Sequence, residues 1–172
     1  MPPKDLSAFG EIQEGIRYLT PEALIWINKR LISIQTPGEM IGVIKPNELG
    51  SSQQRPAQYR YYERNCDMYC LASVLMESLI KNHPFSNANK RTAAASGVLF
   101  LLMNGYELTA PGHELVEIML GVANNEYSRD DLENWLAHWG REFDTRNLNA
   151  PDAWLEMFAA TLVGPGNKTA SP

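Results

Sequence analysis

The sequence contains little cysteine and no long apolar segment. Its two cysteines, Cys66 and Cys70, lie four residues apart in a helical pattern and therefore share one helix face. Neighbouring turns of a helix are a poor place for a disulfide, so we expect reduced thiols and a cytoplasmic protein. The longest apolar run, Val98 to Met103, is much shorter than the roughly 20 residues of a membrane span. Because the N-terminus has no apolar stretch after a basic start, we also expect no secretory signal peptide.

Strong charge of one sign is also absent. The formal net charge is -5, which argues against a broad surface for nucleic acid or anionic membranes, although a local basic patch is compatible with it. We therefore expect no direct nucleic-acid partner and no membrane partner. Zinc sites usually need three or four ligands with recurring spacing, and no second pair complements Cys66 and Cys70, so we expect buried or half-buried thiols. Two histidines, His113 and His138, are predicted to be structural or surface residues.

Apolar residues at helical spacing are abundant, in a chain of 172 residues that is long enough for one domain with its own core. The first helix is predicted to begin at Pro21, after Thr20 as its N-cap, and to stop at residues 36–38. A very apolar helix from about Asn89 to Asn104, followed by Gly105, is predicted to be the buried central helix. Further helices are expected over about residues 65–82, 112–125 and 151–162, and after the N-cap Ser128.

Residues 38–60 lack helical periodicity and are rich in glycine, proline and serine. Within them a short apolar stretch precedes a turn at residues 45–47, and its members are Met40, Ile41, Gly42, Val43 and Ile44. We predict a short flap, resembling a β-hairpin, over the surface of an otherwise all-α helical bundle. The last segment, from Gly164 onward, is expected to be a disordered tail.

The loop between the expected helix of residues 65–82 and the central helix has the composition of a phosphate site. It reads His83-Pro84-Phe85-Ser86-Asn87-Ala88-Asn89-Lys90-Arg91. The start of the following helix presents free backbone N–H groups and the positive end of a dipole, which favour an anion. Lys90 and Arg91 lie in that first turn, where a bound anion would offset the unfavourable dipole. Ala88 is small enough to let a phosphate approach, and His83 suits a general base acting on a hydroxyl.

A purely structural interpretation of the same loop is also open. His83 could cap the preceding helix, and Asn87 could be an ordinary turn residue. We expect Phe85 to be a core anchor for the loop under either interpretation. The residues alone therefore leave catalysis and structure as alternatives at this point.

The string resembles the signature of the Fic family, His-x-Phe-x-Asp/Glu-Gly/Ala-Asn-Gly/Lys-Arg, and is most similar to its Doc (death-on-curing) branch. That branch has Ala-Asn-Lys-Arg-Thr where AMP-transferring members usually have Gly-Asn-Gly-Arg. Weaker similarity covers residues 18–22, the central helix ending at Asn104-Gly105, and residues 121–126. The resemblance spans about residues 18–142. It divides the chain into an N-terminal extension (1–17), a Fic/Doc core (18–142), a C-terminal helical extension (143–163) and a tail (164–172).

The resemblance implies a Fic fold and a nucleotide-dependent enzyme. It implies His83 as the base that activates a target hydroxyl and Asn89, Lys90 and Arg91 as phosphate contacts, with Ser86 and Ala88 beside them. In Doc-like proteins the terminal phosphate of ATP faces the histidine, so the enzyme acts as a kinase. The family target is a threonine of translation elongation factor Tu, whose modification arrests translation. The flap would dock the target by backbone pairing, and a cognate antitoxin would block the site.

Two positions depart from the family pattern. The family's acidic residue that holds Mg²⁺ is here Asn87, a neutral and weaker ligand, which favours reduced metal dependence over complete inactivity. A second arginine of the AMP-transferring branch is here Ala94, which together with Lys90 favours phosphate transfer. Some Fic proteins carry an inhibitory Ser/Thr-x-x-x-Glu-Gly/Asn helix; the nearest string, Ser7 to Glu11, is followed by Ile12, and a real latch would pair Glu11 with Arg91.

Three functions stay open at this stage. The first is a toxin-type protein kinase, the second a nucleotidyltransferase that attaches AMP or another nucleoside monophosphate, and the third a degenerate, non-catalytic Fic binding module, which Asn87 motivates. Trp135 and Trp139 are either core residues or a face that binds the antitoxin. A basic–aromatic patch is either a solvated segment or a contact for target or nucleotide, and it comprises Arg55, Arg60, Arg64, Tyr59, Tyr61 and Tyr62.

Overall fold

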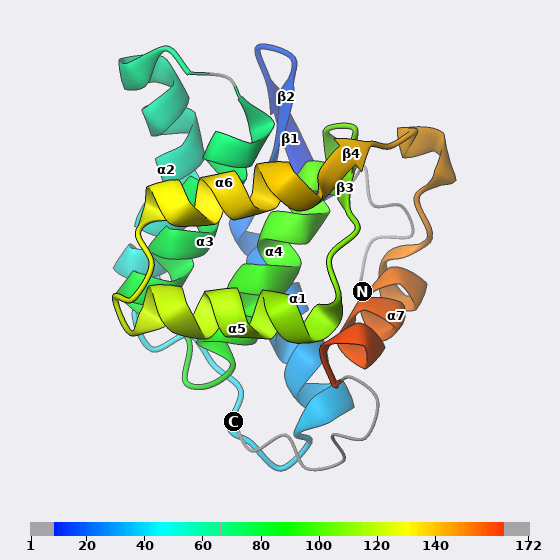
Figure 1. Cartoon of the computed structure of the whole chain (residues 1–172). Coiled ribbons are helices and arrows are strands. Elements are labelled where there is room, and N and C mark those ends of the chain that lie inside the picture. The colour runs from blue at the N-terminus through cyan, green and yellow to red at the C-terminus, as the bar shows by residue number, and fades with distance from the viewer. Residues whose placement is uncertain (1–8, 66, 164–172) are drawn as a thin grey trace.

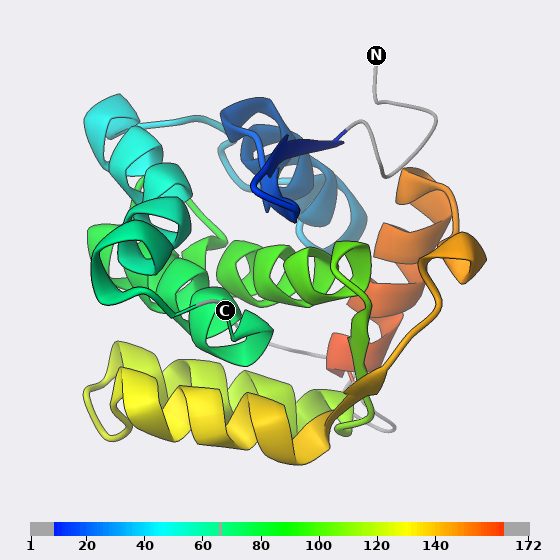
Figure 2. The same ribbon diagram turned by 90° about the horizontal axis from the view of Figure 1, so that it is seen from above.

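The central helix of the chain is α4 (Asn89–Met103), and the other elements pack around it (Figures 1 and 2). The computed structural model describes residues 9–65 and 67–163. Every residue from Thr92 to Met103 is buried, which confirms the central helix expected from its nearly uninterrupted apolar sequence. Its neighbours are α1 (Pro21–Gln35), α3 (Met68–Asn82) and α5 (Gly112–Ala123).

An outer set of helices covers this core. Helices α2 (Pro46–Glu63) and α6 (Arg129–Trp139) pack on α3, while α7 (Pro151–Val163) packs on α1 and α5. Among the described helices, none has the length and apolar character needed to cross a bilayer. The predominance of helices confirms the predicted all-α fold class.

The caps predicted from the sequence form as expected. Thr20 Oγ1 accepts a hydrogen bond from Ala23 N–H at 3.1 Å, and Ser128 forms a reciprocal capping box with Asp131. Gly105 follows α4 with a positive φ of 93°. These local signals place helix ends within one or two residues, except at α3, which starts at Met68 and not near residue 65 because the side chain of Asp67 caps it.

The prediction of irregular structure over residues 38–60 is wrong from Pro46 onward, where α2 begins. The helix could not be recognised from its sequence, because Gly50, two serines and an internal proline, Pro56, all have low helix propensity. Tertiary packing overrides that propensity: Leu49, Ser52 and Pro56 are buried against the rest of the fold, and Asn82 Nδ2 donates to Ser52 Oγ at 2.9 Å. The expected flap is therefore shorter, since only residues 36–45 link α1 to α2 without helix.

Two small antiparallel sheets, each of two strands, were not located by the sequence patterns. Strands β1 (Gly10–Gln13) and β2 (Ile16–Leu19) are joined by Glu14 and Gly15, both at positive φ, as in a type I′ turn. Strands β3 (Tyr106–Leu108) and β4 (Gly140–Glu142) connect the end of α4 to the end of α6. Strands of three or four residues are too short to show a clear period of two.

The remaining sequence predictions concern single residues. Trp135 and Trp139 are half-buried, and His113 and His138 are exposed. The thiol of Cys70 is buried, whereas Cys66 lies outside the described residues, as do Ser7, Ala8 and the tail from Gly164. A short 3-10 turn (Thr145–Asn147) separates β4 from α7.

Candidate functional site

The loop from His83 to Ala88 connects α3 to α4 through two strained residues. His83 ends α3 with φ 50° and ψ 54°, and Ala88 precedes α4 with φ 61° and ψ 30°. The left-handed region costs an L-residue roughly 1–2 kcal/mol, and such strain concentrates at functional sites. Two instances in one short loop indicate a conformation kept for its geometry.

The hydrogen bond of the His83 ring leaves its other nitrogen free as a base. Nδ1 lies 3.0 Å from the carbonyl oxygen of Ile80. Because a carbonyl oxygen only accepts, Nδ1 must carry the proton, and Nε2 of the neutral ring then has an available lone pair. The side chain is exposed, so this lone pair is accessible to a substrate hydroxyl. The capping role that the sequence left open is therefore compatible with a catalytic one.

The N-terminus of α4 has no side-chain cap. Its N-cap residue is Ala88, which has no polar atom to accept the first N–H groups of the helix. The first-turn N–H groups, from Asn89 to Arg91, have no intrahelical partner by geometry. They form the positive end of the helix dipole. This is the arrangement that binds phosphates at helix termini.

Asn89 and Phe85 hold the loop in shape from inside. The Oδ1 atom of Asn89 accepts from Phe85 N–H at 3.0 Å, and its Nδ2 donates to Phe85 O at 2.9 Å. Asn89 is 6% exposed and Phe85 is 1% exposed, as expected of an anchor. The side chain of Asn89 thus bonds the loop backbone in this structure, and only its backbone N–H faces the predicted phosphate position.

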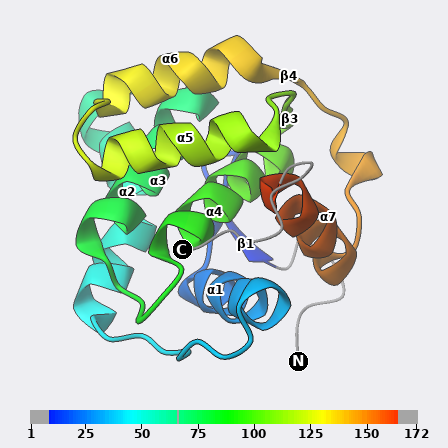
Figure 3. The same ribbon diagram turned by 60° about the horizontal axis from the view of Figure 1, so that its bottom comes forward.

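The flap lies along the loop of residues 83–88 as a short extended segment (Figure 3). Val43 pairs with Phe85, Ile44 N–H donates to Pro84 O at 2.8 Å, and Ser86 N–H donates to Gly42 O at 2.9 Å. In this antiparallel pattern the N–H and C=O of Val43 point away from the loop, toward a free edge. The flap side chains Met40, Ile41 and Ile44 are exposed.

Arg91 is engaged with the end of α1. Its guanidinium donates to Gln35 Oε1 at 3.1 Å and Thr36 Oγ1 at 3.2 Å, and it forms an ion pair with Glu39 at 3.2 Å. Glu11, which only a real inhibitory latch would pair with Arg91, is an exposed residue of β1. An anion at Arg91 would therefore compete with Glu39. None of these three partners was singled out from the sequence, which offers no spacing signal for contacts so distant along the chain.

Lys90 and Ser86 are the uncommitted polar side chains of the loop. Neither the ammonium of Lys90 nor the hydroxyl of Ser86 bonds another residue in the described part of the chain. Both are partly exposed. They are available to a ligand, and Lys90 is the free cation nearest in sequence to the uncapped helix terminus.

Asn28 is a further residue of the site that the sequence analysis missed. It lies on α1 with 1% of its surface exposed, and Nδ2 donates to Asn87 O at 2.8 Å and to Thr92 Oγ1 at 3.0 Å. A signal was present, because Asn28 stands on the apolar stripe that includes Leu24 and Leu31. A polar residue on a buried stripe needs partners.

The residues present do not make a magnesium site by themselves. Asn87 donates its Nδ2 to Met40 O at 3.0 Å, which leaves Oδ1 as a single neutral oxygen for a metal. Among the described residues, no three His, Cys, Asp or Glu side chains gather as a metal site. A magnesium ion would consequently depend on nucleotide phosphates for most of its ligands.

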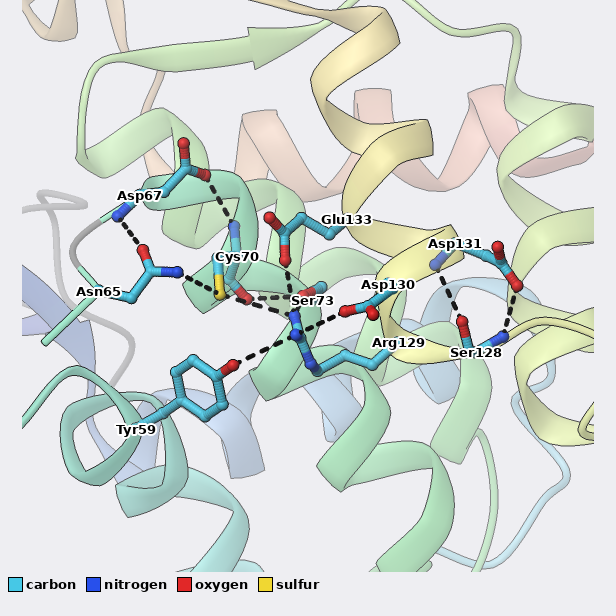
Figure 4. Close-up of polar contacts among 10 residues, drawn as sticks. All are labelled: Tyr59, Asn65, Asp67, Cys70, Ser73, Ser128, Arg129, Asp130, Asp131 and Glu133. Carbon is cyan, nitrogen blue, oxygen red and sulfur yellow. Dashed lines mark hydrogen bonds and ion pairs between the residues drawn. The ribbon is translucent and has the colours of Figure 1, made fainter. Parts of the chain in front are cut away.

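Other polar features of the fold lie apart from this loop. Arg129 of α6 bonds Ser73, Glu133 and Tyr59, which joins α6 to α3 and α2 (Figure 4). Burial beside this cluster raises the pKa of the Cys70 thiol to about 11, so the thiol is not a nucleophile near neutral pH. A surface cavity of about 440 Å³ at the C-terminal end of α4 contains no residue of the loop from His83 to Ala88.

The basic–aromatic patch is divided between structural and exposed residues. Tyr59 stacks under Arg129, and Arg60 pairs with Glu14. Tyr61 and Tyr62 are 74% and 77% exposed at the end of α2 and meet edge to face. The patch is thus a partly packed segment with an exposed aromatic pair, and its suggested contact with target or nucleotide stays a prediction.

Comparison with known proteins agrees with the geometry of the loop. The family model described as "Fic/DOC family" matches residues 18–101. The chain is also 32% identical over 125 residues to "Protein kinase doc" of Escherichia phage P1, with 70% of this chain and 94% of that protein covered. The strained histidine loop, the uncapped helix terminus and these two matches agree, and the chain belongs to the Fic/DOC family.

Proposed function

We propose that this chain is a Doc-type enzyme that transfers the terminal phosphate of ATP to a hydroxyl group of a protein. The observation that carries the proposal is the exposed Nε2 of His83 on the same loop as the uncapped N-terminus of α4. Similarity to a protein named a kinase supports phosphate transfer. The sequence supports it too, because Lys90 and Ala94 stand where AMP-transferring members usually have glycine and a second arginine.

Each step of the reaction has a residue to perform it. Nε2 of His83 takes the proton of the target hydroxyl, whose oxygen forms a bond to the γ-phosphorus of ATP. The bond between that phosphorus and the β,γ-bridging oxygen breaks, and ADP leaves with the electron pair. Lys90 and the N–H groups of the first turn of α4 stabilise the negative charge on the phosphates. A magnesium ion would supply further positive charge to the phosphates, and Asn87 Oδ1 is the side-chain oxygen of this loop that would be open to it.

The flap provides a means to hold the protein substrate. Its free edge at Val43 offers one N–H and one C=O to an extended segment of the target, while Met40 and Ile41 offer apolar contacts. By family resemblance the target is elongation factor Tu, the outcome is arrested translation, and a cognate antitoxin blocks the site. The exposed flap and catalytic loop are the surfaces that such an antitoxin would cover.

One experiment separates the three functions. The protein is incubated with ATP, magnesium and elongation factor Tu, and the intact mass of the factor is measured. A phosphate increment that falls by about 10²–10⁴-fold with His83→Ala supports the proposal. A nucleotide increment would replace it with nucleotidyl transfer. Absence of any increment, with His83→Ala behaving like the unmodified chain in cells, would leave the non-catalytic binding module.

A further inference from the structure

Asn28 occupies a position that packing alone does not explain. It lies on α1 among Leu24, Ile27 and Leu31, each of which is fully buried. A primary amide in such surroundings costs free energy unless its donors and acceptor are satisfied. An apolar residue there would complete the stripe, so the amide must be compensated by the contacts it makes.

Those contacts are on both sides of the α4 N-cap. One donor of Nδ2 reaches Asn87 O and the other reaches Thr92 Oγ1, and these two residues bracket Ala88, the strained residue that precedes the helix. Thr92 N–H in turn donates to Ala88 O at 2.9 Å. A single side chain from α1 therefore spans the whole turn that presents the free N–H groups.

The same contact extends to the flap. Asn28 fixes the backbone carbonyl of Asn87, and the side chain of Asn87 donates to Met40 O at 3.0 Å. The result is a chain of hydrogen bonds that runs from the buried face of α1 through the catalytic loop to the flap. Asn28 itself is buried, and its hydrogen bonds go to Asn87 and Thr92 rather than to the ring of His83 or the ammonium of Lys90.

We propose that Asn28 is a positioning residue that holds the turn at Asn87 and Ala88 in the geometry that binds phosphate. Only the identity of the ligand rests on the proposed function; the ordering of the turn does not. Loss of the amide releases the carbonyl of Asn87, loosens the αL residue Ala88, and disperses the N–H groups from Asn89 to Arg91. Displacement of about 1 Å at such a site costs on the order of a hundredfold in rate.

The chain offers a matched control at the opposite end of α4. Asn104 Nδ2 donates to Arg17 O and Phe100 O, and its Oδ1 accepts from Arg17 N–H, so it is also an amide that ties α4 to a neighbouring element. It lies far along the helix from the catalytic loop. Asn28→Ala and Asn104→Ala should both lower stability, and only the first should disturb the phosphate site.

Two measurements on the full chain decide the proposal. The first is hydrogen exchange at individual amides: Asn28→Ala should accelerate exchange at Phe85 and Thr92 by at least about tenfold relative to α5 and α6, whereas Asn104→Ala should accelerate it at Arg17. The second is the dissociation constant for ATP, which should rise by at least about tenfold in Asn28→Ala and stay unchanged in Asn104→Ala. Thr92→Val removes one acceptor at nearly constant shape, and it should give a smaller change in the same direction even if Asn28→Ala folds poorly.

The outcomes distinguish this inference from the proposed function. Equal exchange at Phe85 and Thr92 in Asn28→Ala, Thr92→Val and the unmodified chain overturns the positioning role, whatever reaction the protein catalyses. Ordinary phosphate transfer and ATP affinity in Asn28→Ala overturn it as well, with the proposed function intact. If the unmodified chain transfers no phosphate, the proposed function fails, while the exchange rates still decide the role of Asn28.

Discussion

Asn87, the residue that departs from the family signature, has a use that an aspartate would not have. Its Nδ2 donates to Met40 O, and a carboxylate in the same place would lack the donor and set a negative charge against a carbonyl. A carboxylate is, however, the stronger ligand for magnesium. The amide therefore adds a hydrogen bond to the flap that a carboxylate could not make, and it would be the weaker ligand for a magnesium ion.

We expect Asn87→Asp to bind magnesium more tightly and to loosen the flap. The metal dependence of ATP binding should shift to lower magnesium concentration, and exchange at the Ile44 and Ser86 amides should accelerate, because both lie in the flap pairing. Asn87→Ala serves as the control that removes the flap bond and adds no carboxylate. Unchanged magnesium affinity in Asn87→Asp would show that this position is not a weakened metal ligand.

Glu39 is the acidic partner of Arg91, and the phosphate of the proposed reaction would have to compete with it. The ion pair is partly exposed, with 21% of the Arg91 side chain and 23% of the Glu39 side chain accessible, so its free energy is modest. Glu39→Gln keeps an oxygen for the guanidinium and removes the charge. We expect ATP affinity to rise by about twofold to fivefold, measured by calorimetry. Weaker binding would indicate that Glu39 orients Arg91 for the ligand.

At the scale of elements, close approach between helices is set by small residues as much as by apolar stripes. Gly112 begins α5 where the backbone of α7 passes, and a Cβ built there would lie 1.7 Å from Thr161 O. Gly50 of α2 has open space, with no atom within 4 Å of such a Cβ. Replacement of glycine by alanine should therefore change the stability of the fold in opposite directions at Gly112 and at Gly50.

We expect Gly112→Ala to lower the free energy of unfolding by about 1–3 kcal/mol, because α7 must move away from α5. Gly50→Ala should raise it by about 0.4–1 kcal/mol, since alanine restricts the unfolded chain and favours helix. Urea denaturation of both variants tests the pair. Equal effects of the two substitutions would mean that α7 does not pack against α5 as described.

At the scale of the molecule, three weakly acidic side chains, one buried and two partly buried, have raised pKa values. Burial raises the pKa of Cys70 from 9.0 to about 11, despite the opposing effect of Arg129. Burial likewise raises the pKa of Tyr59 and Tyr69 above 10.0. These groups keep their protons more tightly in the folded chain than in the unfolded chain, so their contribution is complete below about pH 9 and is lost as pH rises.

The free energy of unfolding should therefore decline between about pH 9 and pH 11. Denaturant titrations across this range measure the decline, and Cys70→Ala should reduce its slope because one of the raised pKa values is removed. A flat profile for the unmodified chain would contradict the burial of these groups.

Local signals in the sequence were sufficient for most of the helices and for the position of the loop between α3 and α4. The caps Thr20 and Ser128 and the terminator Gly105 act through residues within a few positions, and a continuous apolar run makes α4 the core whatever surrounds it. The order of residues from His83 to Arg91 likewise needs no tertiary information to indicate a phosphate site, since a helix N-terminus is local by nature.

Tertiary structure alone decided what holds that loop and which of its groups are free. Helix α2 forms against its own propensity because packing on α3 stabilises it, and Asn28 and Glu39 reach the loop from residues more than fifty positions away in sequence. A pattern of neighbouring residues does not predict such contacts, because the contacts depend on how the helices pack around α4. The sequence by itself thus determined which polar residues the loop contains, and the packing of α1 and the flap determined how they are held.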